Sequence, residues 1–130
     1  MEKWGLGYED LKAINPAIIM VRVSGYGQTG PYASRPGYAS VGEAMGGVRY
    51  VMGEPDRKPS RAGFSLGDSL AGTFATVGAL AALHHRDKTG EGQMVDASIY
   101  ESVLAMTESL VPEYEIEGFT RERTGSFLPA

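Results

Sequence analysis

The sequence predicts an α/β fold, because strand and helix patterns alternate along its 130 residues. Ile18 to Val23 is an apolar run broken only by Arg22, which is typical of a strand buried in a parallel sheet. Leu66 to Arg86 has the spacing of a long helix, and Gln93 to Ile99 alternates as a second strand. Strand, helix and strand in this order favour an α/β architecture.

Shorter elements are predicted around these three. Asn15-Pro16 stops the first helix, and the Gly46-Gly47 pair ends the second. In chain order we expect a helix at Tyr8–Asn15, a Gly/Pro/Ser loop at Ser24–Gly37, a helix at Tyr38–Met45, a short strand at Val48–Met52, a polar loop at Gly53–Gly63, a turn at Lys88–Gly92, and a helix at Tyr100–Val111 that Pro112 ends. Residues 117–130 show no strong period.

The long helix at Leu66–Arg86 is rich in alanine, glycine, serine and threonine, which would let neighbouring backbones approach closely. This composition predicts a helix buried between other elements. So many buried faces in so short a chain lead us to expect a piece of a larger protein. The large apolar residues of the helix mark one face: Leu70, Phe74, Val77, Leu80 and Leu83.

Composition and charge exclude several classes of protein. The net charge is -4 and no basic cluster occurs, which argues against nucleic acid as a partner. The sequence has no cysteine, which excludes disulfides and thiolate chemistry. We expect no membrane association, because no apolar run approaches the roughly 20 residues of a membrane span. The N-terminus does not resemble a signal peptide.

The glycines at Gly25, Gly27 and Gly30 spell G-x-G-x-x-G after an apolar strand, as in a dinucleotide site. Such a site needs the third glycine to open a helix. Pro31 follows Gly30 directly, and Pro36 prevents a long helix there. The sequence therefore favours a structured loop over a dinucleotide site. Loops at the carboxyl ends of strands still line ligand sites in α/β sheets.

Two other groups of side chains are candidates for chemistry. His84 and His85 point about 100° apart on a helix and have no further histidine as a partner, which favours a polar helix end over a metal site. Asp68 lies at the predicted start of the long helix, among apolar and small residues. Helix capping would explain an aspartate there. A carboxylate in this position could also attack an acyl carbon as a nucleophile.

Four stretches of the sequence carry a family resemblance. They are KWGLGYEDLKAINPAIIMVRVSGYGQTGPY, RPGYASVGEAMGG, GDSLAGTFATVGALAAL and HHRDKTGEGQMVDASIYESVLAM. Together they resemble the family III CoA-transferases, also called the CaiB/BaiF type. The resemblance spans the whole chain and implies the central part of a Rossmann-like large domain, without the N-terminal and C-terminal parts of the family fold.

The resemblance implies an enzyme that moves CoA from an acyl-CoA thioester to a carboxylic acid, with coenzyme A as part of the substrate and no metal. Asp68 matches the family's catalytic nucleophile, which forms an aspartyl covalent intermediate. The residues implied to line the CoA site are Arg35, Pro36, Gly37, Tyr38 and Ala39. The stretches PSRAGFSLGDSLAG and ERTGSFLP look closest to members that use succinyl-CoA and a dicarboxylic acceptor.

The family also contains 2-methylacyl-CoA racemases, which use a histidine followed by an acidic residue. Tyr38 and Ala39 stand at those positions here, which favours transfer over racemisation. The resemblance further implies an interlocked homodimer and a cytoplasmic location, or a mitochondrial one in a eukaryote. The alternative is a catalytically silent fragment with a role in assembly only.

Overall fold

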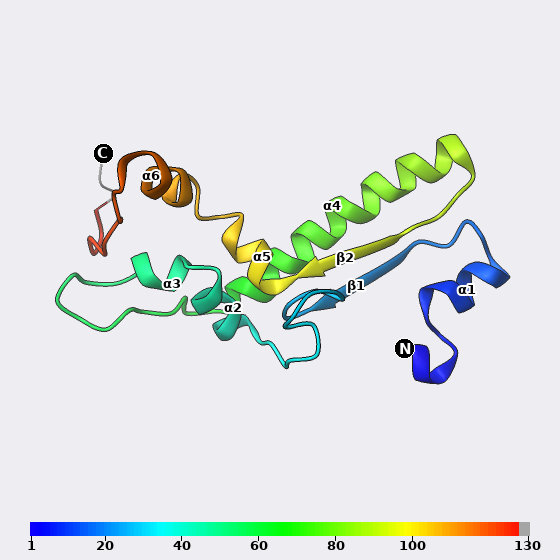
Figure 1. Ribbon diagram of the computed structural model, residues 1–130, viewed down its shortest axis with the longest axis horizontal. Helices are drawn as coiled ribbons and strands as arrows, with labels where there is room; N and C mark the ends of the chain where they lie inside the picture. Colours follow the sequence, from blue (N-terminus) through cyan, green and yellow to red (C-terminus); the bar gives the residue numbers. More distant parts are fainter. Residues whose placement is uncertain (128–130) are drawn as a thin grey trace.

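The computed structural model describes residues 1–127. Its sheet has two parallel strands, β1 (Met20–Ser24) and β2 (Met94–Ser98). Met20 is paired with Met94 and Ser24 with Ser98, so both strands end at the same edge. This confirms both predicted strands and the α/β class. Figure 1 shows the long helix α4 (Leu66–Thr89) lying along the sheet.

The other helices are short, and two of them lie toward opposite ends of an elongated molecule (Figure 1). α1 (Tyr8–Ile14) lies near the N-terminus, and α6 (Leu110–Glu117) lies at the opposite end (Figure 1). The remaining elements are the 3-10 helix η1 (Glu2–Trp4) and the helices α2 (Ala39–Met45), α3 (Val48–Val51) and α5 (Ile99–Leu104), of which α2 and α5 lie near the middle of the molecule. The predicted helices at Tyr8–Asn15 and Tyr38–Met45 are therefore confirmed.

The small residues of α4 form its buried face. Ala71 and Ala82 are completely buried, and a methyl group added to Gly78 would lie 2.5 Å from Val95 Cγ1 in β2. Only a residue without a side chain fits that position. Alanine and glycine thus let α4 approach β2, as the composition predicts. Gly90 ends the helix in the left-handed conformation at φ 79°, within the predicted turn.

Some of the large apolar residues of α4 remain exposed, whereas Leu70 and Leu83 are half-buried. Val77 is 58% exposed and Leu80 is 60% exposed. The expectation of a helix buried between other elements therefore holds for the small-residue face of α4 and not for these two residues. The helix also has the length and mean hydropathy, 1.4 over an 18-residue window, of a membrane span, contrary to expectation. Core helices meet the same criteria, and α4 packs on both strands, α2 and α5.

Two predicted elements differ from the structure. Val48–Met52 was expected as a strand but contains α3, which follows Gly47 at φ 88°. Four residues are too few for apolar periodicity to distinguish a helix from a strand. The helix expected at Tyr100–Val111 is divided into α5 and α6. Pro112 lies in the first turn of α6, where its missing N–H costs no helical hydrogen bond, so it does not end the helix.

Candidate active site

Four segments meet at the carboxyl edge of the sheet. Gly25, directly after β1, packs against Gly37, because a methyl group on Gly25 would lie 2.4 Å from Gly37 Cα. Gly67, in the first turn of α4, would likewise place a methyl group 2.8 Å from Ile99 Cγ2 and 3.1 Å from the Ala39 carbonyl oxygen. Glycines therefore let the loop after β1 approach Gly37, and let the start of α4 approach the start of α2 and Ile99, the first residue of α5.

Side-chain oxygens hold the glycine loop by accepting hydrogen bonds from its backbone N–H groups. Ser24 Oγ accepts a hydrogen bond from Gly27 N at 3.0 Å, and Asp96 Oδ2 accepts one from Gln28 N at 2.6 Å. Gly27 has φ 85°, which favours glycine there. A pyrophosphate site needs such N–H groups free and pointing at the ligand. The loop is a structured turn tied to β2, in agreement with the favoured interpretation.

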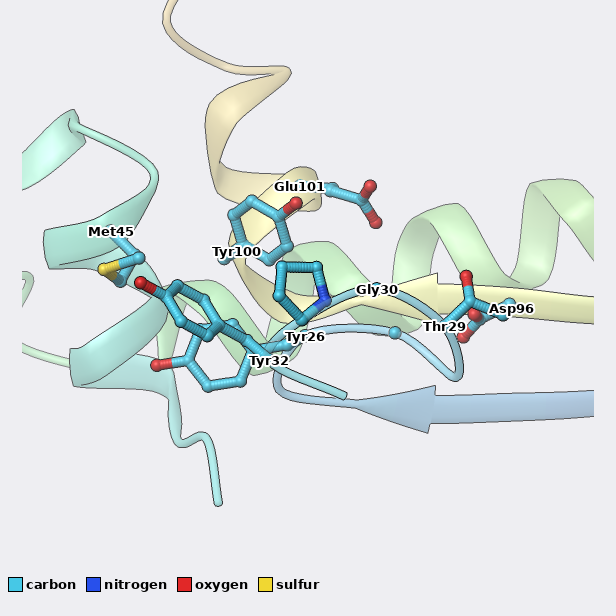
Figure 2. A pocket seen from close by; sticks show the side chains of 10 residues that line it. Tyr26, Thr29, Gly30, Tyr32, Met45, Asp96, Tyr100 and Glu101 are labelled. Carbon is cyan, nitrogen blue, oxygen red and sulfur yellow. The ribbon is translucent and has the colours of Figure 1, made fainter. Parts of the chain in front are cut away.

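The same loop lines a cavity of about 410 Å³ between itself and α5 (Figure 2). Tyr26 lies at the centre of its aromatic wall, with its ring 5.5 Å from that of Tyr32 and 5.8 Å from that of Tyr100. Figure 2 also shows the carboxylates of Asp96 and Glu101 at the cavity. The loop thus lines a cavity at the edge of the sheet, whereas Asp68 does not line it, so the loop's place in a ligand site stays a prediction.

Asp68 occupies the third position of α4, directly after the buried Gly67. Its side chain is exposed and makes no hydrogen bond or ion pair with the residues that the structure describes. Ser65 occupies the N-cap instead, without a capping bond from its side chain. Capping therefore does not account for Asp68. The carboxylate lies where the positive end of the helix dipole favours negative charge.

The structure places the predicted CoA-lining segment beside the start of α4. Ala39 is buried against Gly67, whereas Tyr38 is 69% exposed. Arg35 stacks its guanidinium 4.3 Å from the centre of the Tyr32 ring and is otherwise exposed. Pro36 is exposed, and Gly37 forms the backbone contact with Gly25. Only Ala39 of this segment is thus brought into contact with the residue preceding Asp68.

Several residues at this edge escaped sequence reasoning. Asp96 holds the glycine loop, and Ser98 ends β2 and caps α5, where its hydroxyl accepts from Glu101 N at 3.3 Å. Tyr100 N donates to the Gly25 carbonyl oxygen at 3.2 Å. The V-D-A-S stretch at Val95–Ser98 could have suggested these roles, because its polar residues follow a strand.

The side chains with shifted pKa values lie outside the region around Asp68. The pKa of Glu2 is lowered to about 2 by backbone hydrogen bonds and by Arg22. The pKa of Glu113 is lowered as well, and that of Tyr50 is raised by its hydrogen bond to Glu122. Among residues 1–127, no group of three His, Cys, Asp or Glu side chains gathers as a metal site.

Comparison with known proteins supports the resemblance to the family III CoA-transferases. The model of "CoA-transferase family III" matches residues 1–130. A succinyl-CoA–D-citramalate CoA-transferase of Chloroflexus aurantiacus is 60% identical over 99% of the chain, and a succinyl-CoA–L-malate CoA-transferase beta subunit of that organism is 49% identical over 97%. The chain spans 32% and 31% of these two proteins, about a third of the length of the curated relatives it matches.

The fold agrees with a solved structure of the same kind. A CaiB/BaiF family protein from Brucella suis superposes with a TM-score of 0.91 at 37% identity, over 95% of this chain and 33% of that protein. Sequence and structure comparisons therefore agree over nearly every residue. The chain belongs to CoA-transferase family III.

Proposed function

We propose that this chain is the central part of a CoA-transferase, in which Asp68 is the nucleophile. One observation carries the proposal: an exposed carboxylate without a structural partner stands in the first turn of a long helix, at the carboxyl edge of a parallel sheet. Ligands of open α/β sheets bind at this edge. The buried Gly67 packs against Ala39, and this contact fixes the backbone position from which the Asp68 side chain extends.

In the first half of the reaction, an Asp68 carboxylate oxygen attacks the thioester carbonyl carbon of an acyl-CoA. The C–S bond breaks, which gives a mixed anhydride between Asp68 and the acyl group, and CoA leaves as the thiolate. The thiolate then attacks the aspartyl carbonyl carbon of the anhydride. This step releases the donor acid as a carboxylate and leaves CoA attached to Asp68 as a thioester.

In the second half, the acceptor carboxylate attacks the Asp68 thioester and expels the thiolate again. A mixed anhydride between Asp68 and the acceptor results. The thiolate attacks the acceptor's acyl carbon, so the new acyl-CoA leaves and Asp68 returns to a carboxylate. No electron or proton is gained or lost overall, and the reaction needs only the two acids and CoA.

The neighbouring residues fit supporting roles. Arg35 presents a guanidinium that could bind a phosphate group of CoA. The segment from Pro36 to Ala39 lies between that arginine and the start of α4, and Tyr38 is exposed beside it. These positions suit residues that guide the arm of CoA toward Asp68. Such guidance raises the rate by orienting the thioester for attack.

The donor in our proposal is succinyl-CoA and the acceptor is a dicarboxylic acid, since two relatives at 60% and 49% identity carry succinyl-CoA in their names. We also propose that further chain and a second copy cover this region. The chain exposes 8684 Å², whereas a compact monomer of 13.9 kDa exposes about 6,700 Å². The alpha and beta subunit names of relatives fit an oligomer.

The decisive experiment replaces Asp68 with asparagine in the full-length protein that contains this chain. We expect transfer of CoA from succinyl-CoA to a dicarboxylic acid to fall on the order of ten-thousandfold, because the amide is a poor nucleophile. The matched control is Asp87→Asn, an exposed aspartate near the other end of α4, which should leave the rate unchanged. Transfer by Asp68→Asn at the wild-type rate would refute the proposal.

Two alternatives are tested by the same preparations. Racemisation predicts exchange of the α-proton of a 2-methylacyl-CoA with deuterated solvent in the absence of an acceptor acid; we expect none, because Tyr38 and Ala39 supply no histidine and carboxylate. A silent fragment predicts that the 130-residue chain alone is inactive. We expect this for the isolated chain and full activity for the full-length protein.

A further inference from the structure

Glu43 is the one carboxylate that the protein buries completely within the described residues. It lies in α2, and its exposed fraction is 0%. A buried charge is costly unless it is paired and hydrogen-bonded. Glutamate at this position must therefore perform a task that an apolar residue cannot, and sequence reasoning assigned it none.

The contacts of Glu43 show what that task is. Its Oε2 accepts a hydrogen bond from Ala62 N at 3.3 Å and lies 3.6 Å from Arg49 Nη2 of α3. Glu43 Oε1 and Arg49 Nε are both buried and lack a hydrogen-bond partner within the described residues. Arginine–carboxylate pairs frequently join through two parallel hydrogen bonds, and these two atoms are the ones that a second hydrogen bond between Arg49 and Glu43 would use.

The Ala62 contact lies on the approach to Asp68. Ala62 is buried at the end of the polar loop that precedes α4. Ala39, one helical turn before Glu43 on the same face of α2, contacts Gly67. Helix α2 thus touches the entry into α4 at two points, before and after the exposed stretch at 63–65. The second point is the residue directly before Asp68.

We propose that Glu43 is a positioning residue for Asp68. Its carboxylate fixes Ala62, while Arg49 fixes the carboxylate, and the two contacts of α2 together determine where α4 begins. This inference rests on the function proposed above and adds a residue that touches neither CoA nor the acids. A nucleophile misplaced by about 1 Å can lose on the order of a hundredfold in rate.

The test compares two substitutions of similar volume in the full-length protein. Glu43→Met fills the space but accepts no hydrogen bond, whereas Glu43→Gln keeps an oxygen for Ala62 N. We expect Glu43→Met to lower kcat for CoA transfer about tenfold to a hundredfold, with KM for succinyl-CoA within about twofold of wild type. Glu43→Gln should keep kcat within about threefold. Glu91→Gln, on an exposed turn, is the control and should change neither constant.

A second readout separates positioning from stability. The fraction of Asp68 that carries CoA during turnover, measured by mass spectrometry of the Asp68 peptide, should fall in Glu43→Met and persist in Glu43→Gln. A purely structural role would lower the melting temperature of both variants and leave kcat of the folded protein unchanged. A wild-type kcat in folded Glu43→Met, or equal losses in both variants, overturns the proposal.

If Glu43→Met does not fold, Arg49→Met decides the question. It keeps the Glu43 carboxylate and Ala62 but removes the guanidinium that orients the carboxylate, and we expect kcat to fall about threefold to tenfold at unchanged KM. A wild-type kcat in that variant overturns the proposal. Failure of the underlying function is distinguishable, because it would appear as transfer that survives Asp68→Asn, whatever the Glu43 variants show.

Discussion

Two regions of this molecule are held together by different kinds of contact. At the sheet and along α4, glycines let neighbouring segments approach closely, as at Gly25 and Gly37 or at Gly78 and Val95. Between α3 and the C-terminal segment, long polar side chains make the contact. Arg123 Nη1 donates to the Tyr50 carbonyl oxygen at 2.9 Å, and the Tyr50 hydroxyl donates to Glu122 Oε1 at 2.6 Å.

The difference separates two sources of stability. The glycine contacts depend on shape, since an added methyl group meets backbone or a branched side chain, and they carry no titratable group. The polar contacts depend on charge and can adjust, because arginine and glutamate side chains are flexible. We therefore expect the region around α4 to be sensitive to single methyl groups and the C-terminal region to be sensitive to pH.

The largest expected effect is at Gly25. Gly25→Ala would place a methyl group 2.4 Å from Gly37 Cα, where only backbone movement relieves the clash. We expect the free energy of unfolding of the full-length protein to fall by about 3 kcal/mol, measured by urea denaturation. Gly63→Ala, which meets nothing within 4 Å, is the control and should change it little. Equal effects of both substitutions would show that the close approach is unimportant.

The next test compares two glycines within α4. Gly78→Ala gains helix propensity but places a methyl group 2.5 Å from Val95 Cγ1, so we expect a net loss of about 1 kcal/mol. Gly72→Ala meets nothing within 4 Å and should gain up to about 1 kcal/mol. Thermal unfolding of the full-length protein measures both. A loss at Gly72 as large as at Gly78 would mean that further chain packs closely on that side of α4.

The contrast between shape and charge also explains what the sequence could predict. Apolar runs and breakers placed β1, β2, α1, α2 and α4, because these depend on patterns longer than a turn. The buried face of α4 was not predictable in the same way. Large residues usually mark the core side, yet here Ala71 and Ala75 are buried and Gly78 packs on Val95 of β2, whereas Val77 is exposed.

The site was predictable only in part, for a related reason. Asp68 stood out because its neighbours are small and apolar, which a sequence displays directly. The pairings of Glu43 with Ala62 and of Asp96 with Gln28 join residues 19 and 68 positions apart. No local pattern reports such contacts. They arise from the crossing of α2 and the start of α4, and from the parallel pairing of β1 with β2.

The smallest expected effect concerns Glu113 in α6. The Ser109 hydroxyl and the Arg121 guanidinium both donate to its carboxylate, and they lower its pKa below the ordinary value of 4.5. A carboxyl whose pKa is lower in the folded state stabilises that state above about pH 4.5. The contribution disappears as the pH falls through the folded pKa. This end of the molecule should therefore loosen in acid before the region around α4 does.

Ser109→Ala tests the cause of that shift. Since the hydroxyl makes the largest contribution, the pKa of Glu113 should rise toward 4.5 in the variant, as measured by the carboxyl carbon chemical shift during an acid titration. Ser109→Thr keeps a hydroxyl at the same position and should keep the low pKa. An unchanged pKa in Ser109→Ala would assign the shift to Arg121 alone.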